Sequence, residues 1–209
     1  MKQKDPINVI VTGVGGQGNV LISQLIGKAL VKAGHHVTIG ETYGASQRGG
    51  AVMSHIRISR QEQYGPLIPE GRADVILGLE PVETMRVLAQ YGNPGVVVIA
   101  NSRPVYTLAV TTGAAEYPGS EKIEKTLQEL SSTAWLINAT EIALEMGAPI
   151  LTNIIMAGAL VGSRVLPLEP EGLEAELRDS LPSDKLEVNL QAARRGLEEA
   201  SRRRAAFGA

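Results

Sequence analysis

A glycine-rich turn between a strand pattern and a helix pattern is the feature that most constrains how this chain can fold. Residues 7–12 form a mostly β-branched run, the segment GVGGQG follows at residues 13–18, and apolar residues then recur at helical spacing from Val20 to Leu30. The glycines permit positive φ angles and close backbone approach, and a helix start leaves N–H groups unpaired. Because those donors and the helix dipole both favour negative charge, the pattern predicts a strand–turn–helix unit that binds a phosphate or a carboxylate.

A second glycine-rich loop follows the next predicted strand, residues 37–41. Residues 42–50 have the sequence TYGASQRGG, so that polar side chains stand among glycines with little bulk around them. Arg48 carries a fixed positive charge on a planar donor group that suits a carboxylate or a phosphate, although it could instead pair with a nearby acid such as Glu41. We expect the two loops to lie at the ends of two neighbouring strands.

The same residues allow two other interpretations. The spacing of Gly13, Gly15 and Gly18 fits the fingerprint of NAD-binding folds, and Glu41 lies where such a site needs an acid for a ribose hydroxyl. A dinucleotide site, however, requires neither the long amide of Gln17 inside the turn nor a second conspicuous loop. A further possibility is that the glycines only permit tight packing of the strand on the helix. The residues alone leave these alternatives open.

The order of the remaining patterns predicts the fold class. Strand patterns at residues 51–59, 74–79, 95–100 and 135–137 alternate with helix patterns at residues 81–89, 120–130 and 138–147. Such alternation favours a three-layer α/β/α architecture with a mostly parallel sheet. The chain has 209 residues, is 44% hydrophobic and only 3% aromatic, and so suits one domain, residues 1–209, with a core of Val, Ile, Leu and Ala.

Two segments carry expectations about burial. Along the strand 51–59, Met53, His55 and Arg57 share a face that we expect to be free for a partner or for the glycine loops, with His55 as a hydrogen-bonded structural residue. Residues 150–166 are apolar nearly all round, which predicts a helix buried in the core or by another subunit. Burial of that extent is a mild argument for assembly.

Other segments predict local structure. Residues 102–110 are expected to form a short edge element, and Ser120 is available as the cap of the helix that follows. The last third of the chain predicts C-terminal amphipathic helices. The basic run at residues 202–204 follows Glu198 and Glu199 at the four-residue spacing of helical ion pairs, which indicates a solvated helix face and not a nucleic-acid-binding tail.

Composition excludes several classes of function. The net charge of −2 gives no electrostatic case for nucleic acid or an anionic membrane. The absence of cysteine excludes disulfides and thiolate-held iron–sulfur clusters in this chain. No signal sequence or membrane span is recognisable, so a soluble, cytoplasmic protein is expected. We find no nucleophile–base pair, metal-ligand cluster or GDG-type thiamine diphosphate motif, and therefore expect a chain that is inactive alone.

Taken together, the motifs resemble a known family. The segments GVGGQG at residues 13–18, ETYGASQRGG at 41–50 and SHIRI at 54–58 are similar to the gamma-type domain of the 2-oxoacid:ferredoxin oxidoreductases, and among these to the beta subunits of the indolepyruvate type. The resemblance extends to residues 66–74, 117–118 and 152–154 and covers most of the chain. The pairing of a GGQG turn with an SQRGG loop is far more specific than either motif by itself.

The resemblance implies a role in a heteromeric enzyme, a heterodimer or a heterotetramer. A larger alpha subunit of that complex would hold thiamine diphosphate, Mg²⁺ and [4Fe-4S] clusters, while this chain alone would bind no cofactor. The complex would oxidatively decarboxylate a 2-oxoacid, an aryl pyruvate for the indolepyruvate type, in the presence of coenzyme A and pass electrons to ferredoxin. In such a complex the cofactor performs the carbanion chemistry.

Within this frame we predict that the two glycine loops line the mouth of the partner's reaction site. No residue of this chain is assigned as catalytic or as a metal ligand. The predicted contacts to an anionic group of substrate or coenzyme A are Gly15, Gly16, Gln17, Gly18, Tyr43, Ser46, Gln47, Arg48 and Gly49. A rival hypothesis is a non-catalytic scaffold whose loops only dock the partner.

Overall fold

One six-stranded sheet organises the molecule. The computed structural model describes residues 4–43, 50–106 and 108–207. The strand order is β2-β3-β1-β4-β5-β6, in which β1, β4, β5 and β6 pair in parallel and β3 is antiparallel to both of its neighbours. The strands are β1 Ile7–Val14, β2 His36–Tyr43, β3 Ala51–Ser59, β4 Val75–Gly78, β5 Val97–Asn101 and β6 Thr133–Ile137. The mostly parallel sheet predicted from the sequence is confirmed.

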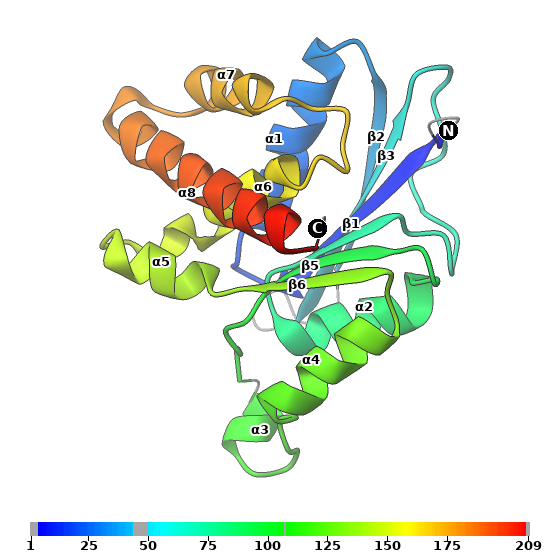
Figure 1. Ribbon diagram of the computed structural model, residues 1–209, viewed down its shortest axis with the longest axis vertical. Helices are drawn as coiled ribbons and strands as arrows, with labels where there is room; N and C mark the ends of the chain where they lie inside the picture. Colours follow the sequence, from blue (N-terminus) through cyan, green and yellow to red (C-terminus); the bar gives the residue numbers. More distant parts are fainter. Residues whose placement is uncertain (1–3, 44–49, 107, 208–209) are drawn as a thin grey trace.

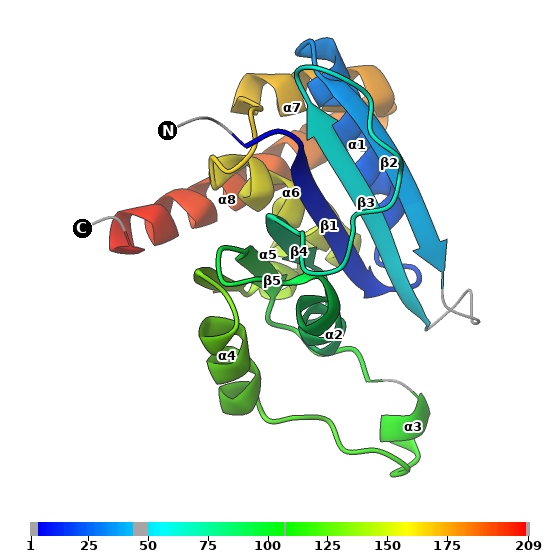
Figure 2. The same ribbon diagram turned by 90° about the vertical axis from the view of Figure 1, so that its right-hand side faces the viewer.

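Helices cover both faces of this sheet, as Figures 1 and 2 show. They are α1 Asn19–Lys32, α2 Pro81–Tyr91, α3 Leu108–Thr111, α4 Ser120–Glu129, α5 Ala139–Glu145, α6 Thr152–Gly162, α7 Pro170–Ser180 and α8 Ser183–Phe207, with a 3-10 turn η1 Pro149–Leu151 before α6. Helices α1 and α6 contact one face, and α2 and α4 contact the other. Because α7 and α8 pack on the outer sides of α1 and α6, the first face is two helices deep.

Helix α6 is the buried centre of that thicker layer. Its residues from position 153 to position 162 are all buried, which confirms the predicted core helix, although η1 shortens it at the start. Glycines bring α6 and α8 together: a Cβ on Gly158 would lie 2.1 Å from the carbonyl oxygen of Ala193, and one on Gly196 would lie 1.9 Å from that of Ile155. Any side chain at either position would force the two helices apart.

The strand order corrects one expectation about the glycine loops. The sequence predicted that β1 and β2 are neighbours, but β3 lies between them and pairs with both. Since β3 is antiparallel to each, β1 and β2 still run in the same direction and end at the same edge of the sheet, where Figure 2 shows their arrowheads on either side of the start of β3. The two loops therefore share an edge but leave strands that are not adjacent.

A second correction concerns the outer face of β3, which is not free. The irregular segment 61–71 runs across this face, as Figure 2 shows, and bonds to β3. His55 is 1% exposed and its Nδ1 accepts the N–H of Ile68 at 3.2 Å, so the predicted structural role of this histidine is confirmed. Arg57 donates to the carbonyl oxygens of Gly65 at 3.1 Å and Leu67 at 3.4 Å. Both side chains hold the segment against the sheet.

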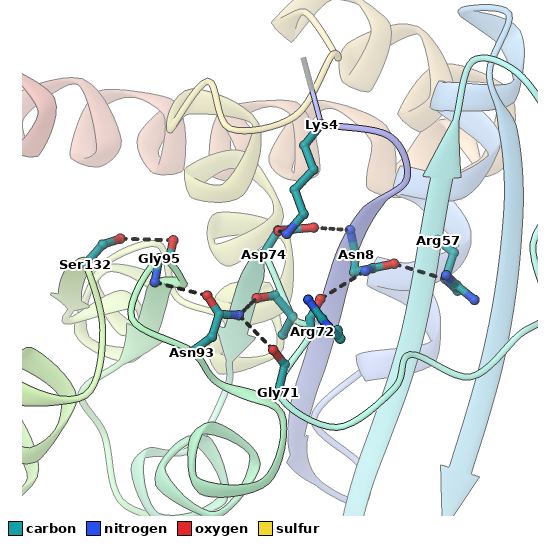
Figure 3. Close-up of polar contacts among 10 residues, drawn as sticks. Lys4, Asn8, Arg57, Gly71, Arg72, Asp74, Asn93, Gly95 and Ser132 are labelled. Carbon is teal, nitrogen blue, oxygen red and sulfur yellow. Dashed lines mark hydrogen bonds and ion pairs between the residues drawn. The ribbon is translucent and has the colours of Figure 1, made fainter. Parts of the chain in front are cut away.

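Polar side chains form a hydrogen-bond network at the amino-terminal end of the sheet (Figure 3). The Asp74 carboxylate accepts the N–H of Asn8 at 2.8 Å and pairs with Lys4. The Asn8 amide donates to the carbonyl oxygen of Arg72 at 2.9 Å and accepts from Arg57 Nε at 3.1 Å. This network joins the starts of β1 and β4 to the last residues of β3, and thereby helps to fix the register of the three strands.

Three smaller predictions are wrong in detail. Residues 102–106 form no strand, and the short helix α3 follows in the region where an edge element was expected. The residue that caps α4 is Gly119, because Ser120 already lies inside the helix. At the end of α8, Glu199 pairs with both Arg202 and Arg203, which keeps the predicted ion-paired helix face but with one shared acid.

Candidate functional site

The glycine turn 13–18 lies at the topological switch point of the sheet, between β1 and β4. β1 and β4 are parallel neighbours, yet the helix that follows β1 packs on one face of the sheet and the helix that follows β4 packs on the other. In open α/β sheets, ligands bind outside the carboxyl ends of the strands at such a switch point. The topology therefore places the turn where a binding site is expected.

Gln17 joins this turn to the end of β4. Its Oε1 accepts the N–H of Val14 at 2.7 Å, and its Nε2 donates to the carbonyl oxygen of Leu79 at 3.1 Å. The N–H of Leu79 in turn donates to the carbonyl oxygen of Thr12 at 2.8 Å. Both ends of the amide are thus used inside the chain, which gives a structural reason for a glutamine in the turn. Its contact with a ligand stays a prediction.

The glycines of the turn have distinct environments. Gly16 has a φ of 101° and no atom near the position of a Cβ, so its backbone faces open space. Gly18 has a φ of 91°, and a Cβ there would lie 2.3 Å from Nδ2 of Asn153, in the first turn of α6. The N–H of Gly15 donates to the carbonyl oxygen of Gly50 at 2.9 Å. The turn therefore packs closely against α6 at Gly18 and is hydrogen-bonded at Gly15 to the residue that precedes β3.

A cleft of about 460 Å³ opens beside the turn. Asn101, at the end of β5, forms its floor: the side-chain nitrogen donates to the carbonyl oxygen of Leu79 at 3.2 Å and to Oγ1 of Thr140 at 2.9 Å. Two amides, Gln17 and Asn101, therefore converge on one carbonyl oxygen. The cleft is lined by Gly16, Gln17, Leu79, Asn101, Arg103, Pro104, Val105, Thr140, Pro149, Ile150 and Thr152.

A buried carboxylate organises the neighbouring segment 102–118. Glu80 is 1% exposed, caps α2 through the N–H of Glu83 at 2.8 Å, and accepts from the hydroxyl of Tyr117 at 2.5 Å. The N–H of Val105 lies 3.4 Å from the same carboxylate oxygen. Burial, and then the hydrogen bond to Glu80, raise the pKa of Tyr117 above its usual value, so the phenol remains a donor. Burial also raises the pKa of Glu83.

The structure describes the residues on both sides of the second predicted loop. Tyr43 ends β2 opposite Val52, and Gly50 accepts the hydrogen bond from Gly15. The loop therefore leaves and re-enters the sheet at the edge that carries the glycine turn. Four of the predicted contacts lie outside the described residues: Ser46, Gln47, Arg48 and Gly49.

Sequence reasoning missed several residues of this edge. Asn101 follows a predicted strand and Glu80 precedes a proline at a helix start, so each carried a local signal: a polar residue at the carboxyl end of a strand, and an acid at a cap position. Tyr117 and Asn153 fell within segments of the family resemblance, but no role was assigned to them. Thr140 carried no signal apart from its place in the first turn of α5.

The fold and the site define an α/β domain with a glycine-rich turn at the switch point of a mostly parallel sheet. The family described as pyruvate ferredoxin/flavodoxin oxidoreductase matches residues 8–199. The chain belongs to this family, and the resemblance read from its motifs is confirmed.

Curated relatives have similar length. The indolepyruvate oxidoreductase subunit IorB of Pyrococcus horikoshii is 39% identical over 194 residues, which cover 92% of this chain and 95% of the relative. The subunit of the same name from Archaeoglobus fulgidus is 38% identical over 194 residues, with 93% and 95% covered. Both names describe a subunit of an oxidoreductase, so the enzyme class predicted from the sequence is confirmed.

Solved structures share the fold. The gamma subunit of a keto/oxoacid ferredoxin oxidoreductase from Geobacter sulfurreducens superposes with a TM-score of 0.66 at 23% identity, covering 93% of this chain and 98% of that one. A 2-oxoglutarate:ferredoxin oxidoreductase from Magnetococcus marinus gives a TM-score of 0.75 at 21% identity, covering 95% of this chain and 32% of the other. These likenesses confirm the predicted fold class.

The described residues contain neither a candidate membrane span nor a candidate metal-binding group. No helix within them is long and apolar enough to cross a bilayer. Nor do these residues gather three or more His, Cys, Asp or Glu side chains in a group suited to a metal ion. The side chains around the cleft are amides, hydroxyls and apolar groups, with Arg103 as the charged residue of its lining. Such a lining can bind and orient a ligand but offers no evident nucleophile or base.

Proposed function

We propose that this chain is the small subunit of a 2-oxoacid:ferredoxin oxidoreductase that acts on indolepyruvate or another aryl pyruvate. The proposal includes a larger alpha subunit as partner, coenzyme A as co-substrate and ferredoxin as electron acceptor. The whole chain, residues 1–209, acts as one gamma-type domain that completes the partner's reaction site. A cytoplasmic location remains a prediction from the sequence.

The observation that carries this proposal is the hydrogen bond from the N–H of Gly15 to the carbonyl oxygen of Gly50. It ties the glycine turn to the point where the second loop rejoins the sheet, so both family motifs meet at one edge. That edge is the switch point, and a cleft opens there. Relatives of about the same length that are named as indolepyruvate oxidoreductase subunits support the choice of substrate.

Thiolate-held iron–sulfur clusters do not fit this chain. It contains no cysteine, so the thiolates that hold iron–sulfur clusters must come from the partner. When bound there, thiamine diphosphate with Mg²⁺ would supply carbanion stabilisation, and the clusters would carry electrons. What this chain adds is a wall for the site, with backbone donors and an arginine that bind and orient anionic groups.

Two N–H groups of the turn already donate within the chain, which limits the groups that could bind a ligand. The N–H groups of Gly15 and Gln17 donate to the carbonyl oxygens of Gly50 and Val14, at 2.9 Å and 3.1 Å. We therefore assign the anion contact of the turn to the backbone of Gly16 and Gly18, and that of the second loop to Arg48. A guanidinium can bind a carboxylate or a phosphate through two parallel hydrogen bonds, which positions the group as well as holding it.

Replacement of Arg48 by alanine in the assembled complex tests this assignment. Loss of a charge-assisted hydrogen bond should lower kcat/KM roughly ten- to a hundredfold, while the larger subunit still co-purifies in normal yield. Arg202→Ala is the matched control, because that side chain is 72% exposed and its ion pair within the described residues is with Glu199 on its own helix. Normal kinetics of the Arg48 variant would contradict the assignment.

The two rival functions make different predictions. In NAD-binding folds the acid that holds the ribose follows the strand next to the glycine turn, whereas here β3 separates the strand of Glu41 from β1. Titration of NAD into the chain should therefore give no saturable binding. A pure scaffold predicts that loop variants lose assembly and that any complex still formed turns over normally. Assay of the Arg48→Ala complex per mole of assembled enzyme separates this case from the proposal.

A further inference from the structure

The carboxyl edge of the sheet carries an exposed apolar surface next to the cleft. Ile150 is 77% exposed and Tyr106 is 60% exposed, the two highest values among the large hydrophobic side chains of the described chain. A second cavity of about 670 Å³ adjoins the cleft and shares Pro104 with it. We call the continuous surface the Ile150–Tyr106 face; it consists of Pro104, Tyr106, Tyr117, Pro118, Pro149 and Ile150.

The composition of this face is that of an interface core. Among the described residues that line the two cavities, Arg103 and Glu124 are charged, and the others are glycines or apolar, aromatic, hydroxyl or amide residues. The cores of protein–protein interfaces are depleted in charge and enriched in aromatic side chains. Soluble monomers rarely expose a contiguous patch of prolines, tyrosines and an isoleucine to water, and such patches mark interaction sites.

Contacts within the chain hold several side chains of this face in place. The hydroxyl of Tyr117 donates to the buried carboxylate of Glu80, and its ring packs edge-on against Tyr106, with centroids 5.2 Å apart. Ile150 lies in η1, between α5 and the first turn of α6, where the N–H of Leu151 donates to the carbonyl oxygen of Ala148 at 2.9 Å. Ordering these groups beforehand lowers the entropic cost of binding.

We infer that the Ile150–Tyr106 face docks onto an apolar segment of the larger subunit, with Ile150 as its central anchor. This inference rests on the proposed function, because the face is continuous with the cleft that would complete the partner's reaction site. A larger subunit whose reaction site is completed by the cleft must approach across this face, whereas a second copy of this chain would close the cleft without supplying such a site. The face therefore fits the larger subunit and not a homodimer.

Another groove offers a comparison. It has a volume of about 710 Å³, lies between α1, β2 and α7, and includes Val31, which is 56% exposed. Its walls carry Lys32, Glu176 and Asp179, which already form ion pairs with one another. A partner that dried this groove would have to desolvate those charges, which makes it the poorer candidate for an apolar contact.

The test measures the affinity of the full chain for the larger subunit from the same organism. Ile150→Asp should weaken binding about tenfold or more, and Tyr106→Ala should weaken it severalfold, as expected of interface anchors. Ile150→Val should bind as the unmodified chain does. Val31→Asp and Leu130→Asp are matched controls, since these side chains are 56% and 51% exposed but lie away from the face, and each should change the affinity less than about threefold.

Circular dichroism of each variant verifies that it is folded, and sedimentation of the free chain shows whether it self-associates. Binding of Ile150→Asp and Tyr106→Ala with unchanged affinity would overturn the inference, as would selective loss of binding in Val31→Asp, loss of a homodimer in Ile150→Asp, or failure of the unmodified chain to bind the larger subunit. A complex that assembles through this face but lacks 2-oxoacid oxidation would contradict the proposed function and leave the docking surface standing.

Discussion

The two ends of the central sheet are built differently. At the amino-terminal end, the Asp74 carboxylate accepts the N–H of Asn8 (Figure 3). The side-chain amides of Asn8 and Asn93 donate to backbone carbonyl oxygens, so these polar groups are hydrogen-bonded to one another or to the backbone. At the carboxyl end, the amides also bond internally, but a cleft and exposed apolar side chains lie beside them. The contrast indicates that the first end serves stability and that the second serves binding.

The largest expected effect tests the amino-terminal end. Asp74→Ala removes the acceptor of the Asn8 N–H and the partner of Lys4, and should lower the free energy of unfolding by about 3 kcal/mol. Urea unfolding followed by circular dichroism measures the loss. Asp74→Asn keeps one oxygen acceptor and should cost clearly less. At a temperature where the variant is folded, turnover of the assembled complex should be normal; reduced turnover would break the division of roles between the two ends.

A change at the carboxyl end should affect both stability and turnover. Gln17→Leu leaves the N–H of Val14 without its acceptor and removes the donor to Leu79, which should cost about 2 kcal/mol of unfolding free energy. Because the turn would also lose its tie to the end of β4, kcat/KM of the complex should fall as well. Paired unfolding and kinetic measurements on this variant and on Asp74→Ala provide the comparison. A stability loss with unchanged kinetics would show that the turn is only structural.

The smallest effect concerns the segment that covers β3. Burial holds the pKa of His55 below its ordinary value of 6.5, and its Nδ1 accepts the N–H of Ile68 only while the ring is neutral. The unfolded chain therefore binds more protons as the pH falls below about 6.5, and the free energy of unfolding should decrease by at most about 1.4 kcal/mol per pH unit.

Unfolding curves recorded between about pH 7.5 and 5.5 measure this change in the free energy of unfolding. His55→Gln should flatten the pH dependence. His35→Gln is the control, because burial also lowers the pKa of His35, and the difference between the two variants isolates the contribution of His55. An unchanged slope in His55→Gln would show that the covering segment does not depend on a neutral ring.

Much of the fold could be predicted from local patterns. The β1–turn–α1 unit, the strand β3 and the core helix follow from runs and periodicities that are long and uninterrupted. The strand order could not, because β3 enters between β1 and β2 through pairings that no periodicity records. One signal was available: residues 44–50 are too few for the crossover that parallel neighbours need, so an antiparallel pair of β2 and β3 was implied.

The candidate site was predictable in outline but not in its bonding. The glycine motifs indicated an anion-binding edge, whereas the partners of Gln17 depend on Leu79, 62 residues further along the chain. The sequence suggested a ligand contact for this long amide, which stays a prediction, but it gave no sign of the two internal hydrogen bonds that Gln17 makes. The convergence of Asn101 on the same carbonyl oxygen was hidden for the same reason, since it arises only when β4 and β5 pair.

The close packing of α6 against α8 also helps to set the position of the first turn of α6. Gly158 and Gly196 set how near the last helix comes to α6, and the first turn of α6 places Asn153 against Gly18. The C-terminal helix thus reaches the glycine turn through a single intermediary. Shortening α8, or enlarging either glycine, should alter ligand affinity at a cleft whose described lining comes from other elements.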